Sequence, residues 1–197
     1  FGFTVTRKTG NAVERNRMLT GESVTPGDVL VALPSPGLRS NGYTLARRLM
    51  FDVAGRSLDD PAWDDAGAPS VADELLRPSV IYAPAVRALL DAVPVHSVAH
   101  ITGGGLPGNL NRVIGDAADA VIDPTSWEAP RIFGELQRIG DVERDEMRRV
   151  FNLGIGMVAA VPPDVVSDAV AVLAEQGIAA SVIGEVVAGT GTVRFTD

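Results

Sequence analysis

An apolar segment that ends in three consecutive glycines is the feature that most constrains the fold of this chain. Residues 95–101 predict a buried strand, Gly103, Gly104 and Gly105 follow, and a helical pattern covers about residues 106–113. This order brings unpartnered backbone N–H groups to the positive end of a helix, where anions bind. Glycine also lets the backbone approach a phosphate closely. The segment therefore predicts a site for a phosphorylated ligand; the alternative is a plain strand-to-helix connection.

The glycines do not form a Walker A phosphate-binding loop. No Gly-Lys-Ser/Thr follows them, and a Walker A loop requires that sequence. A ligand assignment for this turn therefore needs support from elsewhere in the chain.

A second strand, glycine-rich loop and helix occurs earlier in the chain. Residues 28–33 predict a strand, the loop 34–43 contains Arg39, Ser40 and Asn41, and residues 43–53 predict a helix. Ser and Asn are good N-cap residues, and a guanidinium beside a helix start suits a phosphate or carboxylate. The alternative is that Ser40 or Asn41 only caps its helix and Arg39 is solvated.

The remaining pattern predicts one α/β domain of the α+β type, a mixed β-sheet layered with helices. Residues 54–70 are rich in Gly, Asp, Pro and Ala and predict a surface excursion, and 154–161 predict a central strand. Further strands are predicted at 2–7, 118–123, 180–187 and 192–195, and further helices at 84–92, 130–138, 142–150 and 163–176.

Composition restricts the class of protein. The chain has 197 residues, no cysteine and a net charge of −8. The missing thiols exclude disulfides and cysteine nucleophiles, and the negative charge argues against a nucleic-acid partner. No apolar run is long enough to span a membrane. We find no export signal, so we expect a cytoplasmic protein without a membrane partner.

Few side chains offer catalytic chemistry. His96 and His100 are the two histidines, and their spacing places them on one face of the strand predicted at 95–101. No acidic residue stands close to them in sequence, so we predict no metal site. His100 lies beside the glycine turn and is a candidate for ligand binding or proton transfer, or else a structural cap. We expect His96 to serve packing or the surface, and Trp127 to anchor the core or line a cleft.

Five motifs in this order resemble the C-terminal domain of aminoimidazole ribonucleotide synthetases, also called phosphoribosylformylglycinamidine cyclo-ligases. The motifs span nearly the whole chain and are specific in combination. They are residues 26–30 (PGDVL), 37–43 (GLRSNGY), 99–107 (AHITGGGLP), 123–127 (DPTSW) and 151–157 (FNLGIGM). One departure matters, because the family usually carries His where this chain has Arg39. Arginine binds phosphate but does not shuttle protons near neutral pH.

The resemblance implies an ATP-dependent ligase that closes the imidazole ring of formylglycinamidine ribonucleotide. Mg²⁺ and ATP would be held mainly by an N-terminal domain, which would also supply much of a homodimer interface. The small-molecule partners would be the ribonucleotide and ATP. We expect His100 and Arg39 to be catalytic. We expect the substrate or its phosphate to contact Ser40, Asn41, Gly42, Thr102, Gly103, Gly104, Gly105 and Asn152.

The resemblance also suggests how the chain is divided. We expect residues 1–24 to be the end of the N-terminal domain or a linker, and 25–197 to be the C-terminal α/β domain. Without its N-terminal domain the chain is expected to be inactive. Two alternatives stay open: another ATP-using member of the superfamily, such as formylglycinamidine ribonucleotide synthetase or selenophosphate synthetase, and a stand-alone phosphate-binding domain.

Overall fold

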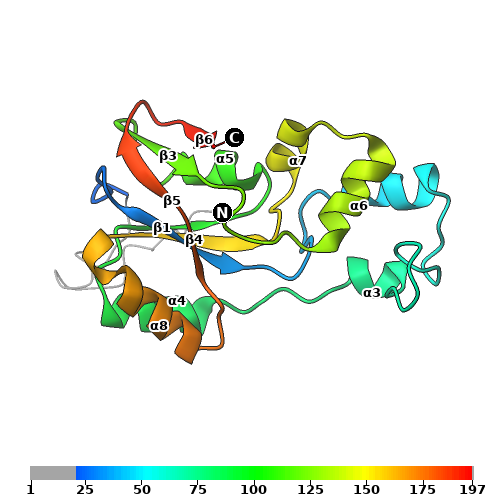
Figure 1. Cartoon of the computed structure of the whole chain (residues 1–197), viewed down its shortest axis with the longest axis horizontal. Helices are drawn as coiled ribbons and strands as arrows, with labels where there is room; N and C mark the ends of the chain where they lie inside the picture. The colour runs from blue at the N-terminus through cyan, green and yellow to red at the C-terminus, as the bar shows by residue number, and fades with distance from the viewer. Residues whose placement is uncertain (1–20, 197) are drawn as a thin grey trace, which may run out of the picture.

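The fold is a mixed six-stranded sheet with helices on both faces and a helical lobe at one end (Figure 1). The structure, a computed structural model, describes residues 21–196. The strand predicted at 2–7 lies outside them. The strands are β1 (Val29–Pro34), β2 (Ser97–His100), β3 (Ala118–Ile122), β4 (Ile155–Val161), β5 (Ser181–Ala188) and β6 (Val193–Phe195). Their order is β2-β4-β1-β5-β3-β6, with every pair antiparallel except β3 and β6. The predicted mixed sheet layered with helices is confirmed.

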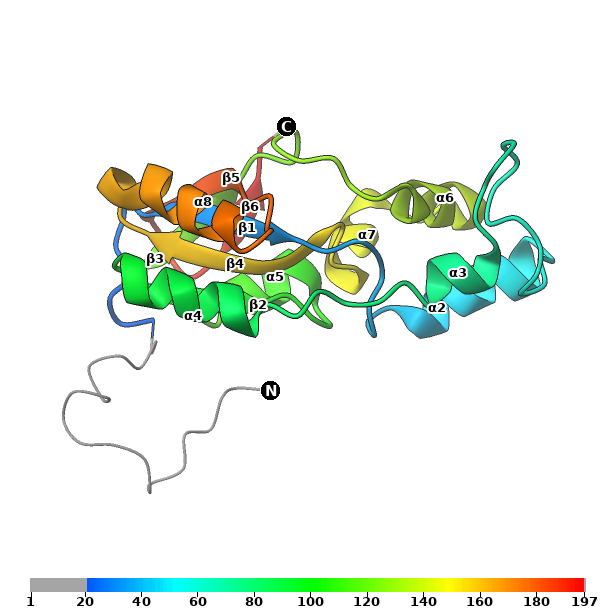
Figure 2. The same ribbon diagram turned by 90° about the horizontal axis from the view of Figure 1, so that it is seen from below.

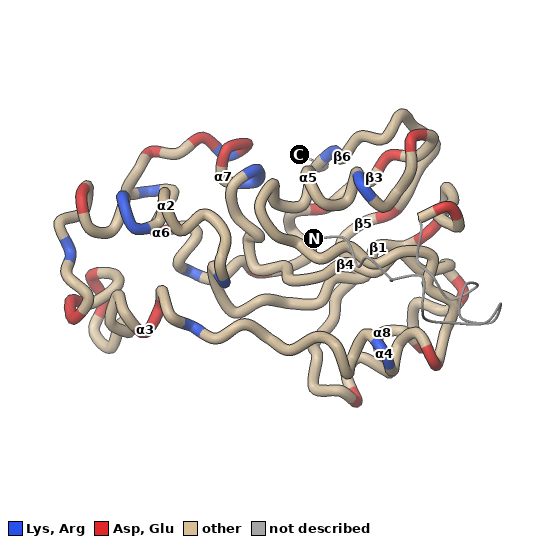
Figure 3. Tube along the Cα trace, turned by 180° about the vertical axis from the view of Figure 1, so that it is seen from behind, with Lys and Arg blue, Asp and Glu red and all other residues tan. Residues whose placement is uncertain are grey.

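Alternation along the central strands gives the sheet two apolar faces. In β1, Leu30 and Ala32 belong to one core cluster, whereas Val31 and Leu33 belong to the other. All of β4 is buried and it pairs on both edges, so the central strand predicted at 154–161 is confirmed. Neither strand contains a charged residue, and both are uncoloured in Figure 3. Such a strand is stable only when both its faces are covered.

Helices cover both faces of this sheet. On one side α4 (Ala83–Ala92) and α8 (Val166–Glu175) supply Leu89, Ala169 and Leu173, after a short turn, η2 (Pro163–Val165). On the other side α5 (Gly105–Leu110) supplies Leu106 and Leu110. The sheet is therefore the middle layer of the larger part of the molecule (Figure 1), and Figure 2 looks onto the face that α4 and α8 cover.

A separate apolar cluster holds the helical lobe together. The lobe contains α2 (Tyr43–Arg47), the π-helical η1 (Arg48–Val53), α3 (Val71–Leu75), α6 (Arg131–Gly140) and α7 (Arg144–Val150). Met50, Phe133, Leu136 and Phe151 are buried at its centre, and the rings of Phe133 and Phe151 lie 5.7 Å apart. The described chain crosses between sheet and lobe four times, and two of these crossings, 35–42 and 151–154, carry predicted site residues.

The predicted helix at 43–53 is continuous but changes type midway. The Ala54 N–H donates to the Leu49 carbonyl at 2.9 Å, five residues back, which is the π-helical pattern. β2 is shorter than predicted, and α3 was not predicted. Ser70 caps α3 by accepting from the Asp73 N–H at 3.0 Å.

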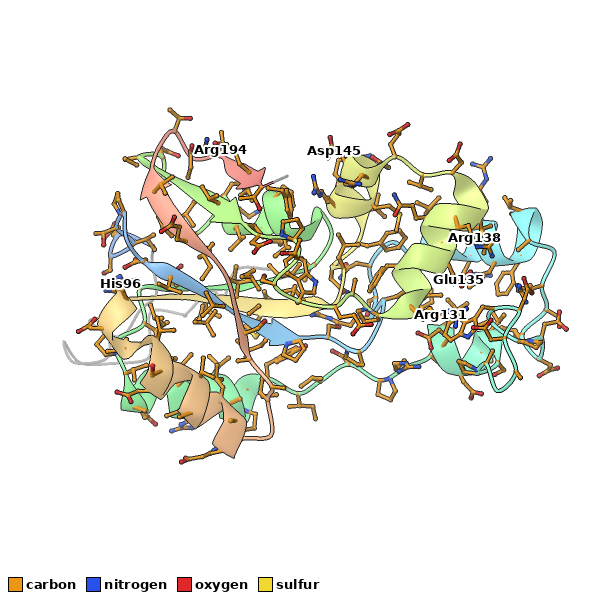
Figure 4. All side chains as sticks on the ribbon, viewed as in Figure 1. His96, Arg131, Glu135, Arg138, Asp145 and Arg194 are labelled. Atoms are coloured by element: carbon orange, nitrogen blue, oxygen red, sulfur yellow. The ribbon has the colours of Figure 1, made fainter. Side chains whose placement is uncertain are left out.

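The excursion at 54–70 is largely exposed, as predicted, although Ala62 is fully buried. Arginines hold it in place: Arg56 contacts Asp64 at 2.7 Å, and Arg131 of α6 pairs with Asp65. Arg131 also lies over the Trp63 ring and continues into a line of charges, Arg131, Glu135 and Arg138, along α6 (Figure 4). No helix among residues 21–196 combines the length and apolar character needed to cross a bilayer.

Asp119 fixes the turn between β5 and β6. Its carboxylate accepts from the Thr190 N–H at 2.8 Å and the Thr192 N–H at 2.9 Å, and Arg194 lies 3.4 Å away. These backbone hydrogen bonds, with a smaller contribution from Arg194, lower the pKa of Asp119 below its ordinary value of 3.8. The charged carboxylate therefore stabilises the folded state.

We predict that Asp119→Asn lowers the thermal midpoint of the chain near neutral pH. Because the folded pKa is depressed, the advantage of the wild type is complete well above pH 3.8 and disappears as the pH falls through the folded value. Thermal melts of both proteins between pH 7 and pH 2 measure this difference. Asp59→Asn, at an exposed position, controls for net charge. A gap between Asp119→Asn and wild type that is independent of pH would contradict the prediction.

Candidate functional site

Two loops far apart in sequence meet at the junction between sheet and helical lobe. A Cβ built on Gly103 would lie 3.8 Å from Oδ1 of Asn41, and Arg39 contacts His100. The loop after β1 and the loop after β2 therefore form one surface. Four of the predicted site residues, Arg39, Asn41, His100 and Gly103, are brought together there.

Arg39 is held by groups from several elements. Its backbone is in the left-handed region, with φ of 60°. Nη1 donates to the Gly156 carbonyl at 3.0 Å, Nη2 contacts Nε2 of His100, and the guanidinium lies 5.9 Å from the centre of the Tyr82 ring. Partial burial lowers the pKa of Arg39 from its ordinary value, but arginine remains a cation at any physiological pH. The guanidinium is therefore held by protein groups, which does not match the alternative of a solvated Arg39.

His100 is the last residue of β2 and its side chain is accessible. Burial of part of the ring, together with the nearby charge of Arg39, lowers the pKa of His100 below 6.5. The imidazole is therefore neutral at pH 7, and the positive charge of this surface comes from Arg39.

Ser40 and Asn41 do not cap the helix that follows them. The N-cap of α2 is Gly42, with φ of 73°, and no side chain caps the helix. A Cβ on Gly42 would collide with the Phe151 ring, so packing explains this glycine. Among residues 21–196, no hydrogen bond is made by the side chain of Ser40 or Asn41. Both side chains are therefore free for a ligand, and the capping alternative is wrong.

The glycine turn is shaped by left-handed backbone at Gly104 and Gly105, with φ of 99° and 60°. A Cβ on Gly105 would collide with the Arg148 carbonyl of α7, so this residue serves packing between α5 and α7. Within the described part of the chain, the N–H groups of Gly103 and Gly104 have no hydrogen-bond partner. These two N–H groups are the donors that the turn leaves for an anion.

Asn109 braces the turn, a role that sequence reasoning missed. Its Nδ2 donates to the Gly105 carbonyl at 2.7 Å and to the Gly103 carbonyl at 3.3 Å. The Thr102 hydroxyl donates to Oδ1 of Asn109 at 3.1 Å, so Thr102 also supports the turn from within. The only available signal was a polar residue at a helix position that the apolar pattern predicts to be buried.

The side chain of Asn152 is also buried and bonded to backbone groups. It is 1% exposed; Nδ2 donates to the carbonyls of Gly37 at 3.0 Å and Leu38 at 3.2 Å, and Oδ1 accepts from the Gly154 N–H at 2.7 Å. The predicted contact with a ligand does not fit this geometry. Asn152 instead fixes the start of the Arg39 loop against the loop that precedes β4.

The other candidates have structural partners. His96 precedes β2, contacts Oδ2 of the buried Asp28 at 2.7 Å, and lies far from α6 (Figure 4). Trp127 packs against the sheet core and donates to the Leu153 carbonyl at 2.9 Å, which matches the predicted core anchor. No group of three or more His, Cys, Asp or Glu side chains within residues 21–196 could hold a metal ion.

Two shallow depressions lie elsewhere on the helical lobe. One of about 460 Å³ is lined by Tyr43, Thr44, Arg47, Arg48, Phe51 and Asp52. Another of about 580 Å³ lies over the 54–66 loop. Neither is lined by the predicted site residues.

Comparisons with known proteins agree on one family. Residues 25–196 match the model of the AIR synthase related protein, C-terminal domain. A phosphoribosylformylglycinamidine cyclo-ligase from Anaeromyxobacter sp. (strain Fw109-5) is 47% identical over 179 residues, covering 91% of this chain and 51% of that protein. One from Geotalea daltonii is 44% identical over 199 residues, covering 98% and 55%. The chain thus spans about half the length of these relatives.

Solved structures share the fold at lower identity. Thiamine-monophosphate kinase from Stenotrophomonas maltophilia K279a has a TM-score of 0.60 and 20% identity, covering 92% of this chain and 54% of that one. E. coli HypE has a TM-score of 0.58 and 18% identity, covering 90% and 48%. A hydrogenase maturation protein HypE in complex with ATP has a TM-score of 0.59 and 20% identity, covering 89% and 49%. At this identity the likeness concerns the fold alone.

We predict opposite effects for alanine at two glycines of α5. Gly105→Ala should destabilise the chain by on the order of 2–4 kcal/mol, because its backbone is left-handed and its Cβ would meet the Arg148 carbonyl. Gly108→Ala should be neutral or stabilising by up to about 1 kcal/mol, because nothing lies within 4 Å of its Cβ. Urea unfolding of the three proteins measures both effects; equal effects would show that α5 does not pack on α7 as described.

Proposed function

The chain belongs to the AIR synthase related protein family, C-terminal domain, and we propose that it is the C-terminal half of a phosphoribosylformylglycinamidine cyclo-ligase. The proposal is supported by identities of 44–47% to two proteins of that name, over 91% or more of this chain. The structural neighbours with other names, a thiamine-monophosphate kinase and HypE proteins, are 16–20% identical. The sequence relatives therefore favour the cyclo-ligase over the other superfamily members.

The proposed reaction closes the imidazole ring of formylglycinamidine ribonucleotide. The formamide oxygen attacks the γ-phosphorus of ATP, and ADP leaves. An internal nitrogen then attacks the activated carbon, and the oxygen departs with the phosphoryl group as phosphate. The product is aminoimidazole ribonucleotide. The protein must hold the substrate folded so that its nitrogen lies close to the carbon, which is mainly a positioning task.

The two loops at the junction are the proposed substrate-holding surface. The observation that carries this assignment is that the side chains of Ser40 and Asn41 and the N–H groups of Gly103 and Gly104 all lack partners among residues 21–196. They meet beside a fixed guanidinium. Neutral donors around one cation suit a phosphate group. Gly42, Gly105, Thr102 and Asn152 shape this surface from behind.

ATP and Mg²⁺ are assigned to the rest of the whole protein. The described residues offer no acidic cluster for a metal ion, so no step of the proposal passes through Mg²⁺ on this chain. The N-terminal part of the relatives, which accounts for the other half of their length, would supply both, together with the homodimer interface. We assign residues 1–24 to that part or to a linker, since the family match begins at residue 25. The chain alone would then be inactive.

We predict that the chain alone binds formylglycinamidine ribonucleotide, and that Asn41→Ala weakens this binding roughly 5- to 30-fold, the cost of one or two lost hydrogen bonds. Isothermal titration calorimetry with the ribonucleotide, and separately with MgATP, measures it. The matched control is Asn111→Ala, at an exposed asparagine at the other end of α5.

The possible outcomes of this titration distinguish whether, and through which loop, the chain holds the substrate. Ribonucleotide binding lost in Asn41→Ala and kept in Asn111→Ala supports the assigned surface. Equal binding by both variants would show that the loop after β1 does not hold the substrate. Absence of ribonucleotide binding by the wild type would contradict the proposal that this half holds the substrate.

A further inference from the structure

The contact between Arg39 and His100 specifies which ring nitrogen of His100 carries its proton. Nη2 of Arg39 lies against Nε2 of His100. A guanidinium has only donors, so the imidazole nitrogen that it meets must be the acceptor. A neutral imidazole has one acceptor and one donor, which puts the proton on the other nitrogen, Nδ1.

We propose that Arg39 is a positioning residue that holds His100 as the neutral Nδ1–H tautomer, leaving Nδ1–H as the group that His100 presents to a ligand. The tautomer follows from the described residues alone. The use of Nδ1–H toward a ribonucleotide rests on the proposed function.

Groups outside the Arg39 loop hold Arg39 in place. Its Nη1 donates to the Gly156 carbonyl of β4, and its guanidinium lies beside Tyr82. Tyr82 is itself fixed, because its hydroxyl donates to the Pro34 carbonyl at 2.6 Å. Asn152 holds the carbonyls of Gly37 and Leu38, the two residues before Arg39. The guanidinium is therefore directed toward His100 before any ligand arrives.

His100 is fixed by the same carbonyl. The Gly156 oxygen also accepts from the Ile101 N–H at 3.0 Å, one residue after His100, and His100 itself pairs with Met157 of β4. One backbone oxygen thus positions both partners. A rotation of Arg39 away from His100 would also leave that oxygen with one donor fewer.

Protonation of His100 is incompatible with this contact. An imidazolium would place a second cation and a donor N–H against a guanidinium, with no acceptor between them. The charged or titratable side chains recorded in this cluster, within residues 21–196, are Arg39, His100 and Tyr82. The lowered pKa of His100, from burial and from the charge of Arg39, agrees with this arrangement. His100 therefore works as a neutral hydrogen-bonding group, and not as an acid through Nε2.

Nitrogen-15 NMR of the full chain at pH 7.5 tests the tautomer. Long-range correlations between the carbon-bound ring protons and the ring nitrogens identify which nitrogen bears the proton. The signals missing from the His100→Gln spectrum are those of His100. We expect a protonated Nδ1 and a bare Nε2 at His100. A wild-type His100 protonated on Nε2, or present as an even mixture, overturns the proposal without need of any variant.

Arg39→Met tests the cause. Removing the donors should shift His100 toward the Nε2–H form and raise its pKa toward the ordinary value in an NMR titration. His96 is the internal control, because its contact with Asp28 does not involve Arg39 and its signals should not move. An unchanged tautomer in a folded Arg39→Met shows that Arg39 does not set it.

The two proposals can fail separately. The NMR experiment needs no ligand, so an Nδ1–H tautomer in a chain that does not bind the ribonucleotide would remove the proposed function and leave this inference standing. Ribonucleotide binding by a chain whose His100 is protonated on Nε2 would do the reverse.

Discussion

The backbone of Gly156 is the point on which the arrangement of the candidate site depends. Its carbonyl accepts from the Ile101 N–H and from Nη1 of Arg39, which joins the end of β2 to the loop after β1. Its missing side chain leaves room for the Tyr82 hydroxyl, which a Cβ would displace. Gly156 lies in β4, which is buried along its whole length, so one residue of the central sheet positions the end of β2, the loop after β1 and Tyr82.

Several glycines of the five motifs serve packing rather than ligand approach. Gly42 faces the Phe151 ring, Gly105 faces the Arg148 carbonyl and Gly154 faces Pro130, so each lies where the sheet and the helical lobe touch. Gly103 and Gly104 instead combine an accessible position with an N–H that has no partner among residues 21–196. A glycine in such a motif can serve either packing or the approach of a ligand, and the sequence alone does not distinguish the two.

The parts of the fold that could be predicted are those with strong periodicity. β1, β4 and α8 have continuous or amphipathic apolar patterns that only one kind of element accommodates. The five residues of α3 are too few for a helical period to be visible, and the change to π-helix in η1 depends on packing in the lobe. The strand predicted at 95–101 is longer than β2 at both ends, although the N–H groups of His96 and Ile101 still donate to carbonyls of β4.

The site was predictable in its location but not in its internal contacts. Motif order and resemblance brought Arg39, Asn41, His100 and the glycine turn together, although 61 residues separate Arg39 from His100. The sequence did not show which polar residues lie on the open surface and which support the backbone from within. Asn109 and Asn152 satisfy buried carbonyls, which depends on backbone that the sequence pattern does not locate.

The proposed phosphate site lies in a chain with a net charge of −8, so a phosphate there would be bound by short-range donors rather than by long-range attraction. At physiological ionic strength, exposed charges beyond about 8 Å are largely screened, so the acidic surface costs little at the site itself. Directed N–H groups, two free polar side chains and one fixed guanidinium act within hydrogen-bond distance. A neutral His100 is consistent with this arrangement. A protonated His100 would be a second cation beside Arg39, partly desolvated and without an anionic partner until the ligand bound.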